Sequence, residues 1–312
     1  MPVKIPSSLP AIEILKKENI FVMSDLRANE QDIRPLRVLI LNLMPIKITT
    51  ETDFIRLLSN NPLQVEMEFL KLETHTSKNT SEEHLSMFYK NFEQIKEDYY
   101  DGMIITGAPV EMLRFEEVNY WDEVTTIFDW ARHHVTSTLY ICWASQAALY
   151  HFYGVEKETL DHKMFGVFKH TVTDKTYPLF RGFDDEFFIP HSRHTTITKK
   201  EIQKEKALSI LAESDESGVA IISSRGGREF YFTGHSEYSP YTLHDEYMRD
   251  KAKGLDINIP CNYYKDDDPE NDPIVRWAGH GNLLFNNWLN YFLYQETPYD
   301  ITQIQHLNEI KQ

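Results

Sequence analysis

The stretch that most constrains this chain runs from Thr138 to Tyr150 and reads TLYICWASQAALY. An apolar run, Leu139 to Ile141, leads directly into Cys142, and the residues after it have helix-favouring composition. This pattern predicts a strand, a sharp turn at Cys142 and a helix. At such a turn the side chain stands out above the sheet, and the free N–H groups of the helix start favour a negative charge there.

A cysteine in this position is a candidate nucleophile, because a helix N-terminus and a nearby imidazole raise the fraction of thiolate. The alternative is an inert buried thiol, since a lone cysteine after an apolar strand is usually a packing residue. The stretch around Cys142 leaves both interpretations open.

Apolar runs and amphipathic helices alternate along the first half of the chain. Leu36 to Leu41 reads as a strand buried on both faces, and Asp101 to Thr106 as a further strand. Asp53 to Asn60 and Val118 to His134 have the spacing of helices with one apolar face. Beyond the Cys142 helix, shorter strands are expected over 163–172, 185–189, 206–212, 219–223 and 229–233.

This alternation predicts an α/β fold with a doubly wound, mostly parallel sheet flanked by helices. Because no linker demands a division, residues 1–312 are expected to form one domain, with an N-terminal arm over 1–34, an α/β core over 35–296 and a C-terminal tail over 297–312. Ligands of such folds bind beyond the carboxyl ends of strands. Thr106 to Glu111, Cys142 and Gly234 to Glu237 all follow predicted strand ends.

His235 follows a predicted strand and a glycine, so its imidazole can stand over the same sheet edge as Cys142, ionise the thiol and shuttle its proton. Glu237, two residues on, points to the same side in extended geometry and can orient the His235 ring. The alternative for each residue alone is structural, with His235 capping a turn and Glu237 facing water. Three strand ends that agree favour a Cys142-His235-Glu237 triad.

Charge and composition exclude several classes of function. Lys plus Arg total 32 against 48 Asp plus Glu, and a net charge of −16 repels nucleic acid and anionic membrane surfaces. No secretory leader or membrane-spanning run is visible, which predicts a cytoplasmic protein. The only cysteines, Cys142 and Cys261, do not make a disulfide framework or a zinc site, and His191 with His194 lacks the further ligands of a metal site.

Several separated motifs resemble one family. The ICWASQAAL turn and the later TGHSE resemble the cysteine and His-x-Glu motifs of the class I glutamine amidotransferase-like fold, which is flavodoxin-like. Within that group NLMPIK, TGAPVE and GHSEYSPYTL make the whole chain similar to the homoserine O-acyltransferases of methionine biosynthesis. True amidotransferases flank the cysteine with glycines, whereas this chain has Ile141 and Ala144, which argues against glutamine hydrolysis.

The resemblance implies a ping-pong reaction in which Cys142 takes an acyl group from acyl-CoA and passes it to the hydroxyl of L-homoserine. His235 then acts as acid and base, and the backbone N–H of Trp143 is placed to stabilise the oxyanion. Lys47, beside the first strand end, is a weaker candidate for contacting CoA or the acyl carbonyl. Acetyl-CoA enters as a co-substrate, with no permanently bound cofactor or metal, and a homodimer is expected.

The resemblance also assigns homoserine contacts to Lys163, Ser192 and Arg249. Arg249 offers a planar fork that fits a carboxylate. From the residues alone, all three would be interpreted as solvated surface side chains.

Glu111 matches the family position that distinguishes acetyl from succinyl transfer, where glutamate resembles the acetyl type. A carboxylate there would fill space and repel a succinyl carboxylate, since like charges about 4 Å apart at an effective dielectric near 20 repel by roughly 4 kcal/mol. The alternative is that Glu111 only begins a helical segment. We therefore expect acetyl transfer, with succinyl transfer as the nearest rival, a glutamine amidotransferase or cysteine hydrolase as the second, and a non-catalytic binding module as the third.

Overall fold

The computed structural model describes residues 4–6, 8–17, 23–24, 34–75 and 79–304. Parts of the expected N-terminal arm (1–34) and C-terminal tail (297–312) lie outside the described residues. Where it is described, the N-terminal segment takes part in the fold, because two short strands add to one edge of the sheet and Leu9, Ala11 and Leu15 are buried. The end of the tail forms a 3₁₀ turn, η6 (Ile301–Gln303).

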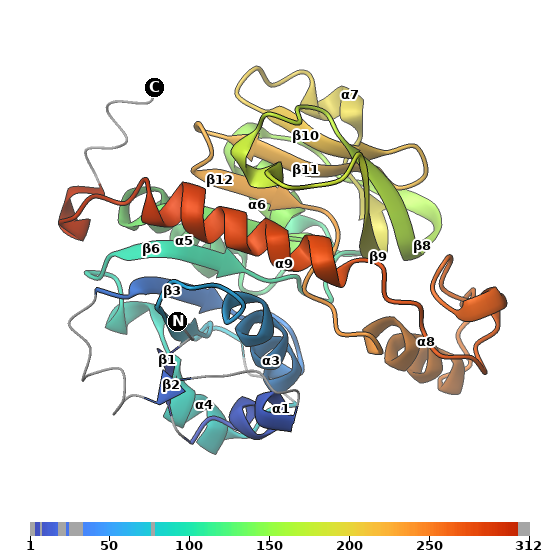
Figure 1. Cartoon of the computed structure of the whole chain (residues 1–312), viewed down its shortest axis with the longest axis horizontal. Coiled ribbons are helices and arrows are strands. Elements are labelled where there is room, and N and C mark those ends of the chain that lie inside the picture. The colour runs from blue at the N-terminus through green and yellow to red at the C-terminus, as the bar shows by residue number, and fades with distance from the viewer. Residues whose placement is uncertain (1–3, 7, 18–22, 25–33, 76–78, 305–312) are drawn as a thin grey trace.

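One twelve-stranded sheet runs through the molecule (Figure 1) in the order β2-β1-β4-β3-β6-β7-β12-β11-β10-β8-β9, with β5 beside β4. The strands are β1 (Lys4–Ile5), β2 (Met23–Ser24), β3 (Leu36–Leu41), β4 (Val65–Leu70), β5 (Tyr89–Lys90), β6 (Tyr100–Ile105), β7 (Val135–Ile141), β8 (Glu158–Val172), β9 (Glu186–Thr196), β10 (Ser209–Ser214), β11 (Gly218–Ser224) and β12 (Glu229–Phe232). From β2 to β12 all neighbours are parallel, and from β12 to β9 they are antiparallel. The predicted α/β class and mostly parallel sheet are confirmed.

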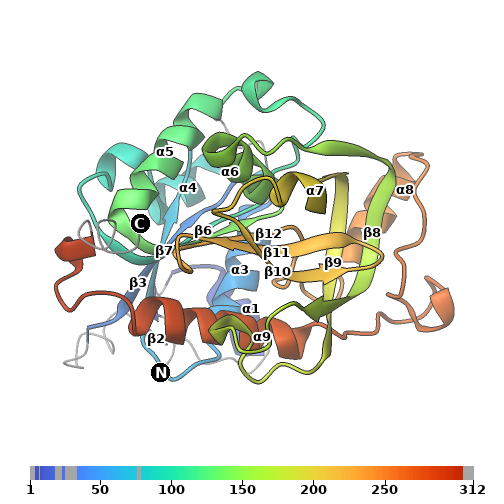
Figure 2. The ribbon, with the colours of Figure 1, turned by 90° about the horizontal axis from the view of Figure 1, so that it is seen from above.

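The helices cover both faces of the sheet. They are α1 (Ala11–Lys17), α3 (Lys47–Leu58), α4 (Glu82–Phe88), α5 (Trp121–His134), α6 (Trp143–Tyr153), α7 (Lys199–Ile202), α8 (Thr242–Ala252) and α9 (Ala278–Asn287), which continues in π-helical turns over Trp288–Tyr294. Figure 2 shows α5 and α6 on one side of the sheet and α9 on the other.

Strand β3 shows why the sheet is buried on both faces. Val38 and Ile40 pack into the core under α3 and α9, whereas Leu39 and Leu41 pack into the core under α5 and α6. Successive side chains of a strand point to opposite faces, so a strand between two helical layers must be apolar throughout.

Several elements differ from the sequence-based expectation. Strand β9 runs to Thr196 rather than to residue 189, and β10 covers Ser209–Ser214 rather than 206–212. Helix α3 begins at Lys47, six residues before the expected Asp53. The sequence does not mark this start, because threonine is a weak helix former and no capping side chain precedes the helix. Strand β8 is longer than expected, since its first half is largely exposed and has no apolar alternation to mark it. It pairs with β9 as an antiparallel ribbon.

Neighbouring strands β7 and β12 come from distant parts of the chain and lie parallel in register, with Ile141 opposite Phe232. Their carboxyl ends therefore bring the residues after Ile141 and after Phe232 to one place. No helix within the described ranges is long and apolar enough to span a bilayer.

Candidate active site

Cys142 occupies a strained turn between β7 and α6. Its φ of 52° and ψ of −113° lie in a region that residues with a side chain rarely adopt. The turn is held because the Cys142 N–H donates to the carbonyl of Phe232 at 2.7 Å, and the Cys142 carbonyl accepts from the N–H of Gln146 in the first turn of α6. The side chain is 9% exposed at the start of the helix, where the free N–H groups favour an anion.

His235 and Glu237 reach the same place from the end of β12. The backbone N–H of His235 donates to the carbonyl of Pro190 at 2.8 Å, which fixes the loop against β9. Its ring nitrogen Nδ1 lies 2.6 Å from Oε1 of Glu237, and the ring also hydrogen-bonds Cys142. The structure therefore brings together the three side chains of the predicted triad.

The surroundings of His235 favour its charged form. Burial favours the neutral ring, but the negative charges of Glu237 and of the Cys142 thiolate, together with the hydrogen bonds to both, outweigh it and raise the pKa of His235 well above its ordinary value. An imidazolium in contact with the sulfur stabilises a thiolate. The triad thus places an imidazole whose charged form is favoured beside the Cys142 sulfur, and a buried carboxylate orients that ring.

Gly107, directly after the loop residue Thr106, leaves the space around the sulfur open. A Cβ at this position would lie 3.2 Å from the Cβ and 3.8 Å from the Sγ of Cys142, and 3.7 Å from Cε1 of His235. Gly107 lies in the segment Thr106 to Glu111 that was predicted to follow a strand end, but it was not among the predicted site residues. A glycine between the end of a strand and a candidate nucleophile is the signal that could have identified it.

Tyr238 was also not among the predicted site residues, although it follows Glu237 directly. Its ring stacks on that of His235, with centroids 4.1 Å apart and an angle of 11°. Its carbonyl accepts a hydrogen bond from Nε1 of Trp277 at 2.8 Å. Burial, and then the carboxylates of Glu246 and Glu237, raise the pKa of Tyr238 well above its ordinary value. Tyr238 therefore packs on the triad and is also affected by the charge of Glu246, which belongs to a second charged cluster.

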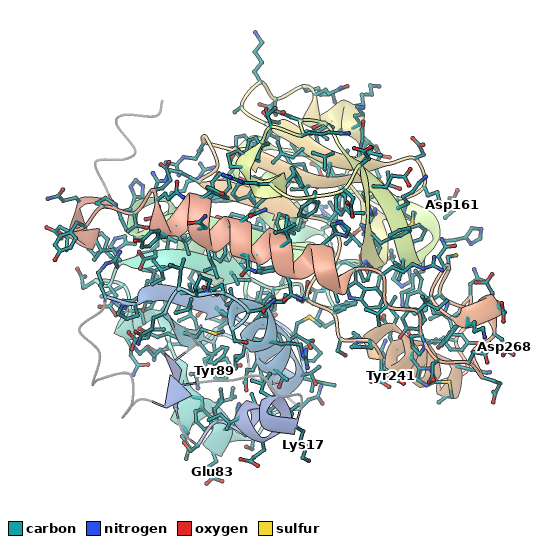
Figure 3. The ribbon with its side chains drawn as sticks, in the orientation of Figure 1. Lys17, Glu83, Tyr89, Asp161, Tyr241 and Asp268 are labelled. Atoms are coloured by element: carbon teal, nitrogen blue, oxygen red, sulfur yellow. The ribbon has the colours of Figure 1, made fainter. Side chains whose placement is uncertain are left out.

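That second cluster contains all three residues assigned to homoserine. Lys163 on β8 and Ser192 on β9 contact Oε1 of Glu246 on α8, with Nζ at 2.7 Å and Oγ at 2.8 Å, and Nη2 of Arg249 lies 3.5 Å from the same oxygen. Figure 3 marks this end of the molecule by Tyr241 and Asp268 near α8 and by Asp161 on the β8–β9 ribbon.

Glu246 is the cluster residue that the sequence analysis missed. It lies one helical turn before Arg249, at the spacing that places two side chains on one face. Asp250 completes the cluster, because it holds Nε of Arg249 at 2.7 Å. Arg249 is still 54% exposed in its side chain, so its guanidinium can meet a ligand from solvent.

Glu111 is fixed by hydrogen bonds rather than by a helix. Its Oε2 accepts from the N–H of His194 at 2.9 Å, and from the N–H and hydroxyl of Thr195 at 3.2 and 3.0 Å. The Thr195 hydroxyl also lies 2.8 Å from Oε1 of Gln146 in the first turn of α6. Glu111 is thereby tied to the turn that carries Cys142. The interpretation as a helix-starting residue is not supported, because residues 109–112 form turns and the next helical segment begins only at Phe115.

The two remaining candidates lie at different distances from the sulfur. Trp143 is the first residue of α6, so its backbone N–H has no partner inside the helix and lies beside Cys142, while its buried ring packs on Tyr120 at 5.9 Å. Lys47 is the first residue of α3, and its Nζ donates to the carbonyl of Asn42 at the end of β3. Strand β6 separates β3 from β7, so the strand end that Lys47 contacts belongs to a strand about 10 Å across the sheet from the Cys142 strand.

His191 has a structural partner. Its Nε2 lies 3.2 Å from Nε2 of His170, and burial lowers the pKa of both rings, that of His170 to about 4. Within the described part of the chain, no group of three or more His, Cys, Asp or Glu residues could hold a metal ion.

Comparison with known proteins assigns the family. The family model for homoserine O-succinyltransferase matches residues 2–299. A homoserine O-acetyltransferase of Phocaeicola vulgatus is 66% identical over 305 residues, covering 98% of this chain and 100% of that protein. Those of Parabacteroides distasonis and Brevibacillus brevis are 64% and 61% identical, over 99% and 96% of this chain and 100% and 98% of theirs.

Solved structures agree at the level of the fold. A glutamine amidotransferase of Thermotoga maritima superposes with a TM-score of 0.53 at 12% identity, covering 84% of this chain and 100% of that one. A glutamine amidotransferase of Methylobacillus flagellatus has a TM-score of 0.50 at 9% identity, covering 84% and 96%. The predicted class I glutamine amidotransferase-like fold is confirmed, and the chain belongs to the homoserine O-acyltransferase family, whose model is described as homoserine O-succinyltransferase.

Proposed function

We propose that this protein is a homoserine O-acetyltransferase, which moves the acetyl group of acetyl-CoA to the hydroxyl of L-homoserine through a thioester on Cys142. The observation that carries the proposal is the buried pair of Cys142 and His235, braced by Glu237 at 2.6 Å, in a chain 66% identical over nearly its full length to a protein named for this reaction.

In the first half-reaction the Cys142 thiolate attacks the carbonyl carbon of the thioester. A C–S bond forms, and the negative charge moves to the carbonyl oxygen, where the N–H of Trp143 can donate to it. When the intermediate collapses, the bond from carbon to the CoA sulfur breaks, and CoA leaves with the proton that His235 had taken from Cys142. The enzyme then holds an acetyl thioester and a neutral imidazole.

In the second half-reaction His235 removes the proton from the homoserine hydroxyl as the oxygen attacks the acetyl carbon. Collapse breaks the C–S bond to Cys142 and releases O-acetyl-L-homoserine, which restores the thiolate and the imidazolium. Glu237 stabilises the positive charge on His235 each time it forms, because its carboxylate lies on the opposite ring nitrogen.

The Glu246 cluster supplies groups for both charges of an amino acid. Arg249 presents a half-exposed guanidinium for the carboxylate, and Glu246 presents a carboxylate for the ammonium. Lys163 and Ser192, which both contact Glu246 Oε1, position that carboxylate. Because the charge of Glu246 acts on Tyr238, and Tyr238 stacks on His235, a homoserine held at the cluster can extend its hydroxyl toward the triad.

Glu111 is proposed to select the acyl donor. Its carboxylate is fixed by Thr195, which is itself bonded to the first turn of α6, so its charge cannot swing away from a bound acyl group without losing three hydrogen bonds. A succinyl carboxylate would meet a like charge, whereas an acetyl group carries none.

The competing function is succinyl transfer, because the matching family model carries that name. Purified protein assayed for thiol release with acetyl-CoA and with succinyl-CoA in the presence of L-homoserine distinguishes the two. We expect a strong preference for acetyl-CoA, and a preference for succinyl-CoA would refute the role of Glu111. We also place this reaction in the cytoplasm, within methionine biosynthesis. The homodimer stays a prediction.

A further inference from the structure

A hollow opens at the carboxyl ends of β3 and β4, on the same sheet edge as the triad but built from other elements. It is a small recess lined by Asn42, Leu43, Lys47, Lys71, Leu72, His75, Leu85 and Tyr120. We call it the basic hollow, because three of its lining residues are basic and none is acidic.

The positive character of this hollow contrasts with the net charge of −16 of the chain. Lys47 is 5% exposed, and its burial lowers its pKa to about 8 even though Glu51 opposes that change. The Glu51 carboxylate is itself held by the Tyr89 hydroxyl at 2.6 Å and by His84 at 2.8 Å. A bound anion would therefore restore to Lys47 the stabilisation that burial removes.

Two contacts connect residues that line the hollow with residues next to Cys142. The Leu43 N–H donates to the Thr106 hydroxyl at 2.8 Å, and Thr106 precedes Gly107, which lies against the cysteine. In addition, the Tyr120 ring lies 5.9 Å from the ring of Trp143. Three strand spacings separate β4 from β7, or about 14 Å. A ligand in the hollow is thus within reach of the sulfur only through a long arm.

We propose that the basic hollow binds the phosphate groups of the acyl-CoA donor while the thioester lies at Cys142. This inference rests on the proposed function, which supplies a donor with several phosphates at one end of a long uncharged arm. Lys71 and Lys47 act as point charges for phosphate oxygens, and His75 adds a donor at the mouth. The homoserine cluster on β8, β9 and α8 is separate, so each substrate approaches the sulfur with its own anchor.

The test compares two donors that differ only beyond the arm: acetyl-CoA and S-acetylpantetheine, which has no phosphate. The variant is the double substitution Lys71→Met and His75→Gln. Its control is Lys199→Met, which removes a positive charge from α7, where Lys199 pairs with Glu213. Circular dichroism and thermal melting establish that each variant is folded.

The donor ratio is kcat/KM for acetyl-CoA divided by kcat/KM for S-acetylpantetheine. We expect this ratio to be about 10- to 100-fold lower in the double variant than in the wild type, which corresponds to the loss of one charge-assisted contact. The change should reside in KM, and calorimetry should show weaker binding of free CoA but not of pantetheine. The control should keep the wild-type ratio.

An unchanged donor ratio, or equal losses with both donors, would overturn the assignment of the hollow while leaving acetyl transfer intact. If the wild-type protein instead releases no thiol from acetyl-CoA in the presence of homoserine, the proposed function fails, and this assignment fails with it.

Discussion

Replacing Glu237 by glutamine tests whether its charge, rather than its shape, sustains the triad. The substitution keeps the size of a side chain that is 9% exposed and removes the negative charge that lies 2.6 Å from Nδ1 of His235. Opposite charges whose centres are about 4 Å apart attract by about 4 kcal/mol at an effective dielectric near 20. A neutral hydrogen bond would recover about 1 kcal/mol of this. The net loss of about 3 kcal/mol predicts a roughly 100-fold fall in kcat/KM for acetyl-CoA.

The same substitution should shift the pH dependence of Cys142 reactivity. Glu237 raises the pKa of His235, so the imidazolium that stabilises the thiolate persists to higher pH in the wild-type protein. Without that charge the imidazolium loses its proton at lower pH, and the thiolate loses its counter-ion. Alkylation of Cys142 by iodoacetamide should then reach half its maximal rate at a higher pH in the Glu237→Gln variant than in the wild type.

The assay needs a background that reports one thiol only. Cys261 is free and exposed, so both proteins should carry Cys261→Ser. Glu213→Gln, which removes a carboxylate paired with Lys199 on the surface, is a matched control and should keep both the rate and the pH profile. If neither the alkylation profile nor kcat/KM changes in Glu237→Gln, the electrostatic reasoning is refuted. The negative charge of Glu237 would then contribute neither to Cys142 reactivity nor to catalysis.

Three further substitutions test the residues proposed to select the acyl donor, to leave room for it and to bind homoserine. Glu111→Gly should increase the use of succinyl-CoA relative to acetyl-CoA in a thiol-release assay, because the carboxylate held by β9 is gone; an unchanged donor preference would remove Glu111 from the account. Gly107→Ala should lower kcat about tenfold or more in a protein that still folds, since its Cβ would lie 3.2 Å from the Cβ and 3.8 Å from the sulfur of Cys142, where the acyl group must fit. Normal turnover in this variant would show that the donor approaches elsewhere. Glu246→Gln should raise KM for homoserine about 10-fold or more and leave the acetylation of Cys142 in the absence of homoserine unaltered; an equal defect in acetylation would assign Glu246 to the first half-reaction instead.

The triad was predictable from the sequence because its residues follow strand ends. Cys142 and His235 each come directly after or soon after an apolar run, and parallel neighbours bring such ends together. Neither apolar segment shows that β7 and β12 are neighbours in the sheet. The sequence therefore supports the triad only because several predicted strand ends carry suitable residues.

The Glu246 cluster contains residues that sequence patterns alone do not identify. Lys163, Ser192 and Arg249 carry no periodic signal, and they meet only because the β8–β9 ribbon lies beside α8. Their assignment came from resemblance to a family, and Glu246, the carboxylate on which they converge, was not identified at all. The basic hollow is similar, because Lys71 and His75 lie in an irregular segment after β4 whose partners are set by tertiary packing.

The central claim is that Cys142 carries the acetyl group between the two substrates. Mixing the enzyme with acetyl-CoA in the absence of homoserine, quenching in acid and analysing peptides by mass spectrometry tests this directly. We predict an acetyl group on the peptide that contains Cys142, a burst of free CoA equal to the enzyme concentration, and loss of the adduct when L-homoserine is added. An unmodified Cys142 in an enzyme that turns over normally when both substrates are present would contradict the account, because the acetyl group would then pass between the substrates without visiting the sulfur.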